Sequence, residues 1–190
     1  MTLDACFDDV LAAAQTGASW ALTELYRDVH PSVLRYLRSQ EPVDGEDVAS
    51  QVWIDVARSL PRFTGGEDDF RRWIFTIARR RLIDVRRSRA RRCVEPIDPS
   101  DQAAEYESTD ADADPATTVT DGMTTADAIA QLRAMLPPDQ AEALVLRVVS
   151  GLDVAQVASI MGKQAGTVRV LQHRAIRRLS AAGWRWMVTN

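Results

Sequence analysis

Ten arginines lie in the segment from Phe70 to Arg92, which contains one acidic residue and no lysine. A guanidinium group binds phosphate oxygens through several N–H donors at once, so arginines at this density favour a polyanionic ligand. Aromatic residues, Phe70, Trp73 and Phe75, are interleaved with them. Arginines beside aromatic rings suit a surface that binds a phosphate backbone and stacks an unpaired base. Packing in the core is the stronger interpretation for Phe70 and Phe75, which leaves Trp73 as the better stacking candidate.

The same segment contains no glycine or proline and is predicted to form one helix with two different sides. At 100° per residue, one side gathers Arg72, Thr76, Arg79, Arg80, Arg86 and Arg87. The opposite side gathers Phe70, Ile74, Ile77, Ala78 and Val85, with Arg81 among them. The basic side could follow a nucleic-acid backbone and release counterions as it binds.

A second basic helix is predicted near the C-terminus, within a helix–turn–helix pattern. Asp153 can cap a short helix, Gly162 can adopt the left-handed conformation of a tight turn, and a longer helix follows from near Ala165 to about Ser180. The residues expected to pack between the two helices are Val157, Ala158, Met161, Val168, Ile176 and Leu179.

The outer face of this longer helix carries residues that can contact DNA, because a recognition helix enters the major groove by its N-terminal half. Arg169 and Arg174 can donate to guanine or phosphate, and Val170 can meet a thymine methyl group. The full outer set is Thr167, Arg169, Val170, His173, Arg174 and Arg177. An ordinary basic helix on a small bundle is the alternative, and the preceding turn favours DNA binding.

Charge is segregated along the chain, although the total is only −4. Residues 1–70 carry a net charge of −8, residues 71–92 carry +9, residues 93–127 carry −10 and residues 128–190 carry +5. Blocks of alternating sign indicate several surfaces with different partners.

The predicted elements are all helical, so the fold class is all-α. Ser19 is a candidate N-cap for a long helix, in which Pro31 would cause a kink or a break. Asp44 can cap the next helix, which Pro61 ends. The apolar stripe of the long helix consists of Trp20, Leu22, Leu25, Tyr26, Val29, Val33, Leu34 and Leu37.

Two small helical domains are expected, at residues 1–92 and 124–190. Residues 93–123 between them are rich in Asp, Ala, Thr, Ser and Pro and almost lack large apolar side chains. Such a segment cannot bury enough surface to offset its ordering entropy, so a flexible acidic linker is predicted.

No constellation of residues that could carry out covalent chemistry is recognisable. Cys6 and Cys93 lie far apart without a second cysteine or histidine at metal-binding spacing, and His30 and His173 have no identifiable catalytic partner. We therefore expect a non-enzymatic protein with no cofactor and no metal. No apolar run reaches the roughly 20 residues that span a bilayer, and the N-terminus lacks the features of a signal peptide, so a cytoplasmic protein without membrane insertion is expected.

Two long stretches together resemble a known family. The stretch "DGEDVASQVWIDVARSLPRF…FRRWIFTIARRRLIDVRR", followed by "LPPDQAEALVLRVVSGLDVAQVASIMGKQAGTVRVLQHRAIRRL", is similar to the bacterial sigma-70 family. The resemblance is closest to the extracytoplasmic-function (ECF) group, which keeps only regions 2 and 4, and it covers nearly the whole chain apart from the termini and the linker. It implies an alternative sigma factor that binds core RNA polymerase, recognises −35 and −10 promoter elements and promotes melting.

The resemblance also implies which residues have which role in region 2. The "EDVASQVW" helix matches the segment that docks on the clamp helices of the β′ subunit, here through Glu46, Asp47, Gln51 and Trp53. The loop before Phe70 matches the part that captures an unstacked base, and the arginines after it match the part that holds the −10 backbone. The implied −10 contacts are Phe63, Thr64, Phe70, Arg72, Trp73, Thr76, Arg79, Arg80, Arg86 and Arg87.

For region 4, the resemblance implies that the helix–turn–helix reads the −35 element and that an apolar surface meets the β flap. The acidic linker would run through the active-site and RNA-exit region of polymerase. Many relatives are held inactive by an anti-sigma factor, which is a further expected partner.

The chain departs from the family at two places. Ser50 and Gln51 stand where the family usually has Gln-Glu, which makes Asp47 the firmer polymerase contact. Leu171 and Gln172 exchange the usual order of a polar residue and a leucine, which leaves open whether Val170, Leu171 or His173 faces DNA.

Two other functions remain as alternatives. A conventional repressor or activator would use the helix–turn–helix on a palindromic operator without polymerase. A nuclease would need clustered carboxylates or metal-binding histidines, and the acidic residues here lie mostly in the linker and at helix starts.

Overall fold

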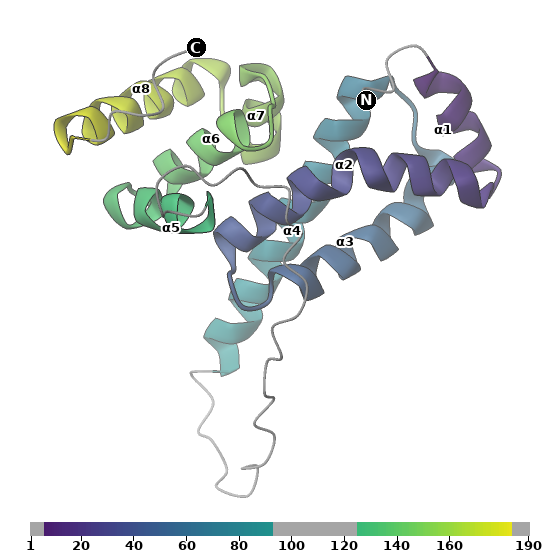
Figure 1. Ribbon diagram of the computed structural model, residues 1–190, viewed down its shortest axis with the longest axis horizontal. Helices are drawn as coiled ribbons and strands as arrows, with labels where there is room; N and C mark the ends of the chain where they lie inside the picture. The colour runs from purple at the N-terminus through teal and green to yellow at the C-terminus, as the bar shows by residue number, and fades with distance from the viewer. Residues whose placement is uncertain (1–5, 93–124, 184–190) are drawn as a thin grey trace, which may run out of the picture.

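A computed structural model describes residues 6–92 and 125–183, in which every regular element is helical. The first unit contains α1 (Phe7–Gln15), α2 (Ser19–Gln40), α3 (Gly45–Ser59), the 3₁₀ turn η1 (Leu60–Arg62) and α4 (Glu67–Arg92). The second contains α5 (Thr125–Met135), α6 (Pro138–Val148), α7 (Val154–Met161) and α8 (Ala165–Ala181). The two units lie side by side in Figure 1, with α1–α4 on the right and α5–α8 on the left. The all-α prediction is confirmed, and the predicted linker lies outside the described residues.

The core of the first unit forms where the apolar rows of its long helices meet. In α2 the fully buried positions Leu25, Val29, Val33 and Leu37 follow each other at four-residue spacing. They form one stripe because residues four apart lie on the same face of a helix. The rows that meet this stripe are Val48, Val52 and Val56 of α3 and Ile74, Phe75, Ala78 and Leu82 of α4.

The structure of α2 corrects three local predictions. Ser19 is the first residue of α2 rather than its cap, because Ala18 holds the extended N-cap conformation. Pro31 does not break α2, which runs unbroken to Gln40, and the alternative of a kink stays a prediction. The proline lies on the exposed side, where the carbonyl that loses its partner can bond to water. Trp20 and Tyr26, placed in the apolar stripe by sequence, are 59% and 40% exposed, because they lie about 140° and 100° around the helix from the buried Leu25.

The helix–turn–helix forms as its sequence predicts. The Asp153 carboxylate accepts from the Gln156 backbone N–H at 2.7 Å, and the Gln156 side chain accepts from the Asp153 N–H at 2.8 Å, which together cap α7. Gly162 ends α7 with φ of +64°, a conformation that favours glycine.

The prediction that Ile176 of α8 packs inward is wrong. The buried positions are Val168, Ala175 and Leu179, which lie on one side of the helix. Ile176, predicted to pack inward, is 42% exposed because it lies 100° around the helix from Ala175.

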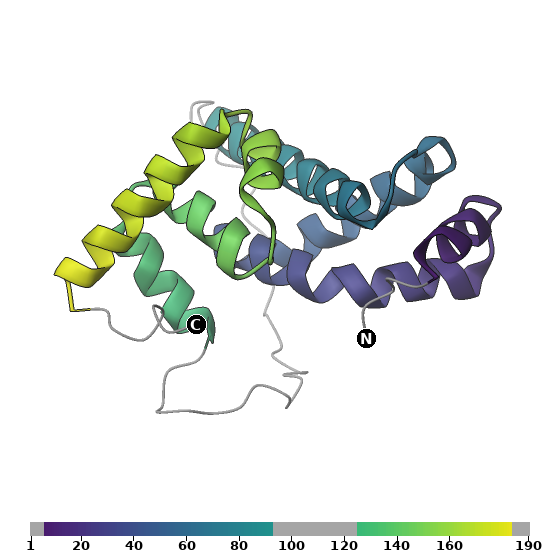
Figure 2. The same cartoon turned by 90° about the horizontal axis from the view of Figure 1, so that it is seen from above.

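The two units contact each other through α2 and α4 on one side and α5, α6 and α7 on the other. Viewed from above in Figure 2, α7 lies between α4 and the rest of the second unit. At the centre of the interface, the Glu142 carboxylate accepts from the Arg79 Nε at 3.0 Å and from the Tyr36 hydroxyl at 3.0 Å. Burial, with the Glu142 carboxylate beside it, raises the pKa of the Tyr36 hydroxyl well above its usual value, so this group stays a donor.

Further polar contacts surround this triad. The Gln156 amide donates to the backbone carbonyl of Asp68 at 3.2 Å, and Arg72 donates to the Ser159 hydroxyl at 3.3 Å. Arg133 of α5 donates to the carbonyls of Ser39 and Gln40 at the end of α2. The interface therefore combines these hydrogen bonds and one ion pair with apolar packing, because the buried apolar residues of both units belong to one core cluster.

Two glycines of the second unit test the role of the turn. Gly162→Ala is expected to lower the free energy of unfolding by about 1 kcal/mol, because a Cβ is strained at positive φ although no atom lies within 4 Å of it. Gly166→Ala, in the first turn of α8 and equally open, is expected to raise it by about 0.4–1 kcal/mol. Urea unfolding of both variants measures the difference, and a shift of both in the same direction would contradict the assignment.

The contact between units can be tested at Glu142. Glu142→Gln keeps an acceptor for Tyr36 but removes the ion pair with Arg79, so the units are expected to separate more often. Small-angle X-ray scattering would then give a larger radius of gyration at unchanged helix content. Asp139→Asn is the matched control on the same helix, because Asp139 pairs with Lys163 of its own unit at 3.0 Å. An unchanged radius for Glu142→Gln would show that the ion pair does not hold the units together.

Candidate nucleic-acid interface

Neighbouring helices supply carboxylate partners for many of the arginines of α4. Arg81 forms a two-pronged ion pair with Asp55 of α3, with N–O distances of 2.5 and 2.6 Å. The hydrogen bonds from Arg81 lower the pKa of the Asp55 carboxyl group. Arg71 binds Asp28 of α2 at 2.8 Å and Glu67 at 3.0 Å. These pairs let a highly charged helix pack against α2 and α3, because each partly buried guanidinium has an opposite charge beside it.

The pairing also reaches the predicted basic face. Arg79 binds Glu142, Arg86 binds Glu41 at 3.0 Å, and Arg72 binds Asp69 at 2.7 Å. Arg86 also donates to the backbone carbonyl of Gln40 at 3.1 Å. These three arginines were predicted to contact the −10 element, and in this conformation each is already held by a carboxylate.

Arg80 and Arg87 differ from the other predicted arginines. Both are exposed, and neither forms an ion pair with any residue in the described part of the chain. With Trp73 they are spaced seven residues apart, which aligns all three along one side of α4 over roughly 21 Å. Arg91, one turn after Arg87, is exposed on the same side. We call Trp73, Arg80 and Arg87 the open row of α4.

A groove between α3 and α4 begins at this row. Its volume is about 520 Å³. Trp73 and Arg80 line it from α4, and Arg58 and Ser59 line it from α3. The Arg81–Asp55 pair and Ile77 complete its lining together with Asp84. The groove therefore combines one aromatic face with two exposed arginines that lack an ion-pair partner among the described residues, which suits one unstacked nucleotide.

The loop between η1 and α4 is fixed beside the groove. The Gln15 side-chain amide of α1 donates to the carbonyls of Leu60 and Phe63 at 3.2 and 2.7 Å. The Phe63 ring is half-buried against Trp73, with 4.8 Å between ring centroids. Thr64 is exposed next to it. The loop thus packs Phe63 against the Trp73 ring, and Trp73 also lines the groove.

Two predicted −10 residues have other surroundings. Phe70 is 1% exposed and lies between Phe7, Phe63 and Trp73, so its ring is part of the core and is not available to a base. Thr76 is exposed on α4, where its hydroxyl donates to the Arg72 carbonyl at 2.8 Å.

The predicted polymerase contacts on α3 divide between two faces. Asp47 and Gln51 are exposed on the outer face, with Ile54, 41% exposed, at its centre. Glu46 is exposed but paired with Arg38 of α2. Trp53 is turned toward α2, where its indole N–H donates to His30 Nδ1 at 3.0 Å. Burial and the nearby Arg38 lower the pKa of His30, which keeps its ring neutral and able to accept this hydrogen bond.

The outer face of α8 agrees with its predicted composition. All six predicted residues of this face are exposed: Thr167, Arg169, Val170, His173, Arg174 and Arg177. Leu171 and Gln172 are half-buried, with Leu171 packed against the core. The order of Leu171 and Gln172 therefore leaves Val170 and His173 as the outward residues.

Several residues of these surfaces were missed by sequence reasoning. Arg58 and Ser59 enter the groove only because α3 packs against α4. Ile54 lies opposite the buried row of α3, three residues after Gln51 and seven after Asp47, so its helical spacing from these two residues was a usable signal. Glu142 could not be paired with Arg79, 63 residues away, without the tertiary structure.

Two further findings concern the described residues as a whole. No helix among them is both long and apolar enough to cross a bilayer. They also contain no cluster of three or more His, Cys, Asp or Glu side chains that could hold a metal ion.

Comparison with known proteins places the chain in a family. Residues 22–92 match the model for Sigma-70 region 2, and residues 126–179 match the model for Sigma-70, region 4. The chain is 32% identical over 178 residues to the ECF RNA polymerase sigma factor SigD of Mycobacterium tuberculosis (strain H37Rv), covering 90% of this chain and 81% of SigD. It is 34% identical over 175 residues to the ECF RNA polymerase sigma factor ShbA of Streptomyces griseus, covering 88% and 90%.

The fold is also similar to that of a solved sigma factor. The structure of RpoE in complex with the anti-sigma factor NepR from Bartonella quintana matches with a TM-score of 0.64 at 24% identity, over 84% of this chain and 94% of RpoE. The two family models cover more than half of the chain, and they match it in the order that the sequence predicted. The chain belongs to the sigma-70 family and is an alternative sigma factor of the ECF group, which directs RNA polymerase to promoters.

Proposed function

We propose that the two units of this sigma factor bind different parts of a promoter while α3 binds core RNA polymerase. Residues 1–92 would act as region 2 on the −10 element, residues 124–190 as region 4 on the −35 element, and residues 93–123 as the acidic linker between them. The observation that carries this proposal is the open row of α4 beside the groove, in a helix whose other described arginines are largely paired.

The proposed −10 contact consists of side chains that remain accessible on α4 and across the groove. Trp73 offers a half-buried ring on which one base can stack, and Arg80 and Arg87 can bind successive phosphates along the same side of α4. Arg58, across the groove, can close around the same strand. Phe63 and the loop held by Gln15 keep the Trp73 ring in place, so little side-chain entropy is lost when a base binds.

Melting then follows from preferential binding rather than from covalent chemistry. A site that accepts an unstacked base binds open DNA better than duplex DNA and shifts the equilibrium toward the open form. Extruding a base costs a few kcal/mol, and stacking on an aromatic ring returns about 1–3 kcal/mol per base. Contacts with core polymerase must supply the remainder.

Arg79 and Arg72 enter this scheme only when the two units separate. In the packed arrangement Glu142 and Ser159 of the second unit hold them. A promoter phosphate would replace the Glu142 carboxylate at Arg79, so DNA binding and separation of the units would favour each other.

For the −35 element, the exposed face of α8 is the proposed reader. Val170 and His173 face outward between Arg169 and Arg174, at the N-terminal half of the helix that enters the major groove in this motif. The arginines would contact phosphate or guanine, and the valine would contact a thymine methyl group.

The polymerase contact is proposed for the outer face of α3, around Ile54 with Asp47 and Gln51. An exposed isoleucine between polar residues suits the centre of a protein interface. The clamp helices of β′ are the proposed partner here, and the β flap is the proposed partner of the second unit. An anti-sigma factor is a further proposed partner, supported by a similar fold in complex with one.

Gel filtration with core RNA polymerase, followed by run-off transcription from a genomic fragment library, tests the proposal as a whole. Co-elution and a defined set of start sites are expected. Tight binding of a palindromic duplex without polymerase would instead support the conventional regulator.

Promoter opening should depend on the open row. On promoters obtained from that library, Arg80→Ala with Arg87→Ala is expected to reduce the rate of open-complex formation about tenfold and to flatten its salt dependence. Trp73→Ala should reduce the rate of open-complex formation on duplex templates. The reduction should be smaller on a template with a preformed bubble, because melting is then bypassed. Arg27→Ala, a single exposed charge on α2, is the control. Unchanged opening in the double variant would remove α4 from the DNA interface.

Polymerase binding should depend on Ile54. Ile54→Asp is expected to weaken binding to core polymerase at least tenfold, because it places a charge at the centre of an apolar contact. Val43→Asp, at another exposed apolar position of the same unit, is the control. Equal affinity of Ile54→Asp and wild type, measured by fluorescence anisotropy, would place the polymerase contact elsewhere.

A further inference from the structure

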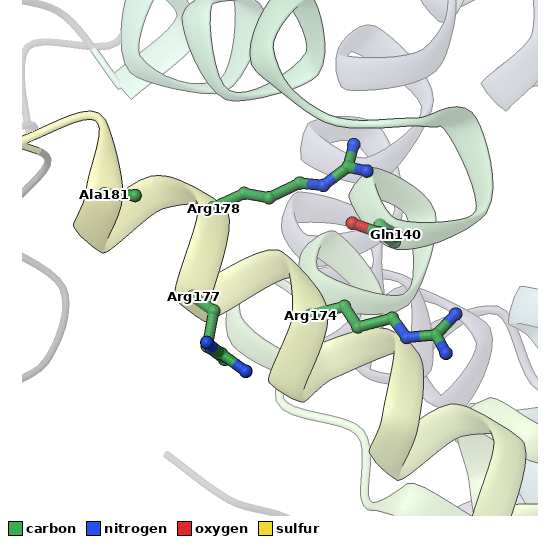
Figure 3. Close-up of a pocket in the computed structure, with 5 residues that line it drawn as sticks. All are labelled: Gln140, Arg174, Arg177, Arg178 and Ala181. Atoms are coloured by element: carbon green, nitrogen blue, oxygen red, sulfur yellow. The ribbon is translucent and has the colours of Figure 1, made fainter.

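A small cavity lies between α8 and the start of α6. Its volume is about 430 Å³, and it is lined by Gln140 of α6 and by Arg174, Arg177, Arg178 and Ala181 of α8. In Figure 3, Arg174 and Arg178 extend from α8 on either side of Gln140, while Arg177 points away from it at the rim. Residues four apart lie on one side of a helix, which explains how Arg174 and Arg178 flank the same point.

The positive charge of this cavity is not compensated within the described part of the chain. None of its three arginines forms an ion pair there, and all three are exposed. The two acidic residues of α6 are engaged elsewhere: Asp139 binds Lys163 at 3.0 Å, and Glu142 binds Arg79 at 3.0 Å. The fold thus keeps carboxylates away from the cavity that the arginines surround.

Gln140 supplies an independent observation. The residue is 7% exposed, and its side-chain oxygen, Oε1, is buried without a hydrogen-bond partner. A buried acceptor without a donor is unfavourable, and Figure 3 shows the side chains of Arg174 and Arg178 on either side of Gln140. A guanidinium placed over Gln140 would satisfy Oε1 with one N–H and direct its remaining N–H groups into the cavity.

We propose that this cavity is a binding site for one backbone phosphate of duplex DNA, with Arg174 and Arg178 as ligands and Gln140 as the residue that positions Arg178. The inference rests on the proposed −35 contact of α8 and adds to it a phosphate site formed jointly by α6 and α8. The phosphate draws the two guanidinium groups inward, and Gln140 fixes the plane of one of them.

Duplex DNA is favoured over other anions by the position of the cavity. It lies on the flank of the helix whose outer face carries Arg169, Val170 and His173. When that face enters a major groove, the flank is turned toward the wall of the groove, where the phosphates lie. Half or more of protein–DNA hydrogen bonds go to the backbone, and such contacts fix how a recognition helix lies on the duplex.

The test uses the full chain and a random-sequence DNA duplex of two helical turns, because a phosphate contact does not depend on sequence. Affinity is measured from roughly 50 to 200 mM salt. Arg178→Ala is expected to weaken binding about tenfold at low salt and to reduce the slope of log K against log salt by about 0.9. Arg27→Ala, which also removes one exposed arginine, should change neither.

Gln140 is tested by its dependence on Arg178. Gln140→Leu is expected to weaken duplex binding severalfold, without lowering the unfolding temperature, because it removes an acceptor that has no partner in the free protein. In the Arg178→Ala background it should have no further effect. Gln140→Glu should abolish the phosphate contact, because its carboxylate would bind Arg178 directly.

The variants distinguish failure of the phosphate site from failure of the proposed −35 contact. If Arg169→Ala weakens binding but Arg178→Ala and Gln140→Leu do not, the cavity is not a phosphate site and the α8 face stands. If none of the three matters, the second unit does not bind DNA and the proposed −35 contact fails with it. Loss of affinity for core polymerase with unchanged duplex binding would make the cavity a protein-docking surface and overturn the proposal.

Discussion

Helix α4 can pack in a bundle only if most of its guanidinium groups find an acceptor. A charge that loses water without gaining a partner is costly, and ten arginines in one helix would be incompatible with close packing against several neighbours. Asp55 from α3, Asp28 and Glu41 from the α2 side and Glu142 from α6 provide the partners. The acidic character of residues 1–70 is therefore a structural counterpart of the basic helix.

The pairing also determines which arginines of α4 remain available to a polyanionic ligand. The arginines that face another helix are neutralised, and Arg80 and Arg87 of the open row have no ion-pair partner among residues 6–92 and 125–183. A helix with uniform positive charge would bind any polyanion along its whole surface. The paired helix offers charge mainly next to Trp73 and the groove, so that the phosphate contacts lie beside the ring on which a base can stack.

In the second unit, too, the position of the acidic residues decides which arginines remain exposed. The acidic residues of α6 are directed to Lys163 and to the first unit, and the arginines of α8 are left without them. Glu142 links the two surfaces, because the carboxylate that joins the units also occupies Arg79. Packing of the units and exposure of Arg79 are thus mutually exclusive, and any polyanion that binds Arg79 competes with the second unit for it.

The sequence by itself determined the all-α fold class and the order of the helices. Capping by Asp153, the positive φ of Gly162 and the four-residue spacing of Leu25, Val29, Val33 and Leu37 are local properties, which depend on residues within about two turns. The outward face of α8 followed from the same periodicity. The core position of Phe70 followed from it too, whereas the family resemblance alone implied a DNA contact for this residue. Ile176 was misplaced because a residue near the edge of an apolar stripe is assigned to one side only by the helix that covers it.

Only the tertiary structure decided which charges are free. Arg79 and Arg80 are adjacent in the chain and identical in chemistry, yet one binds a carboxylate 63 residues away and the other remains exposed in the groove. Neither local propensity nor periodicity contains that information. Ion pairing depends on which helices come within about 4 Å of each guanidinium, and that is set by the packing of the whole bundle.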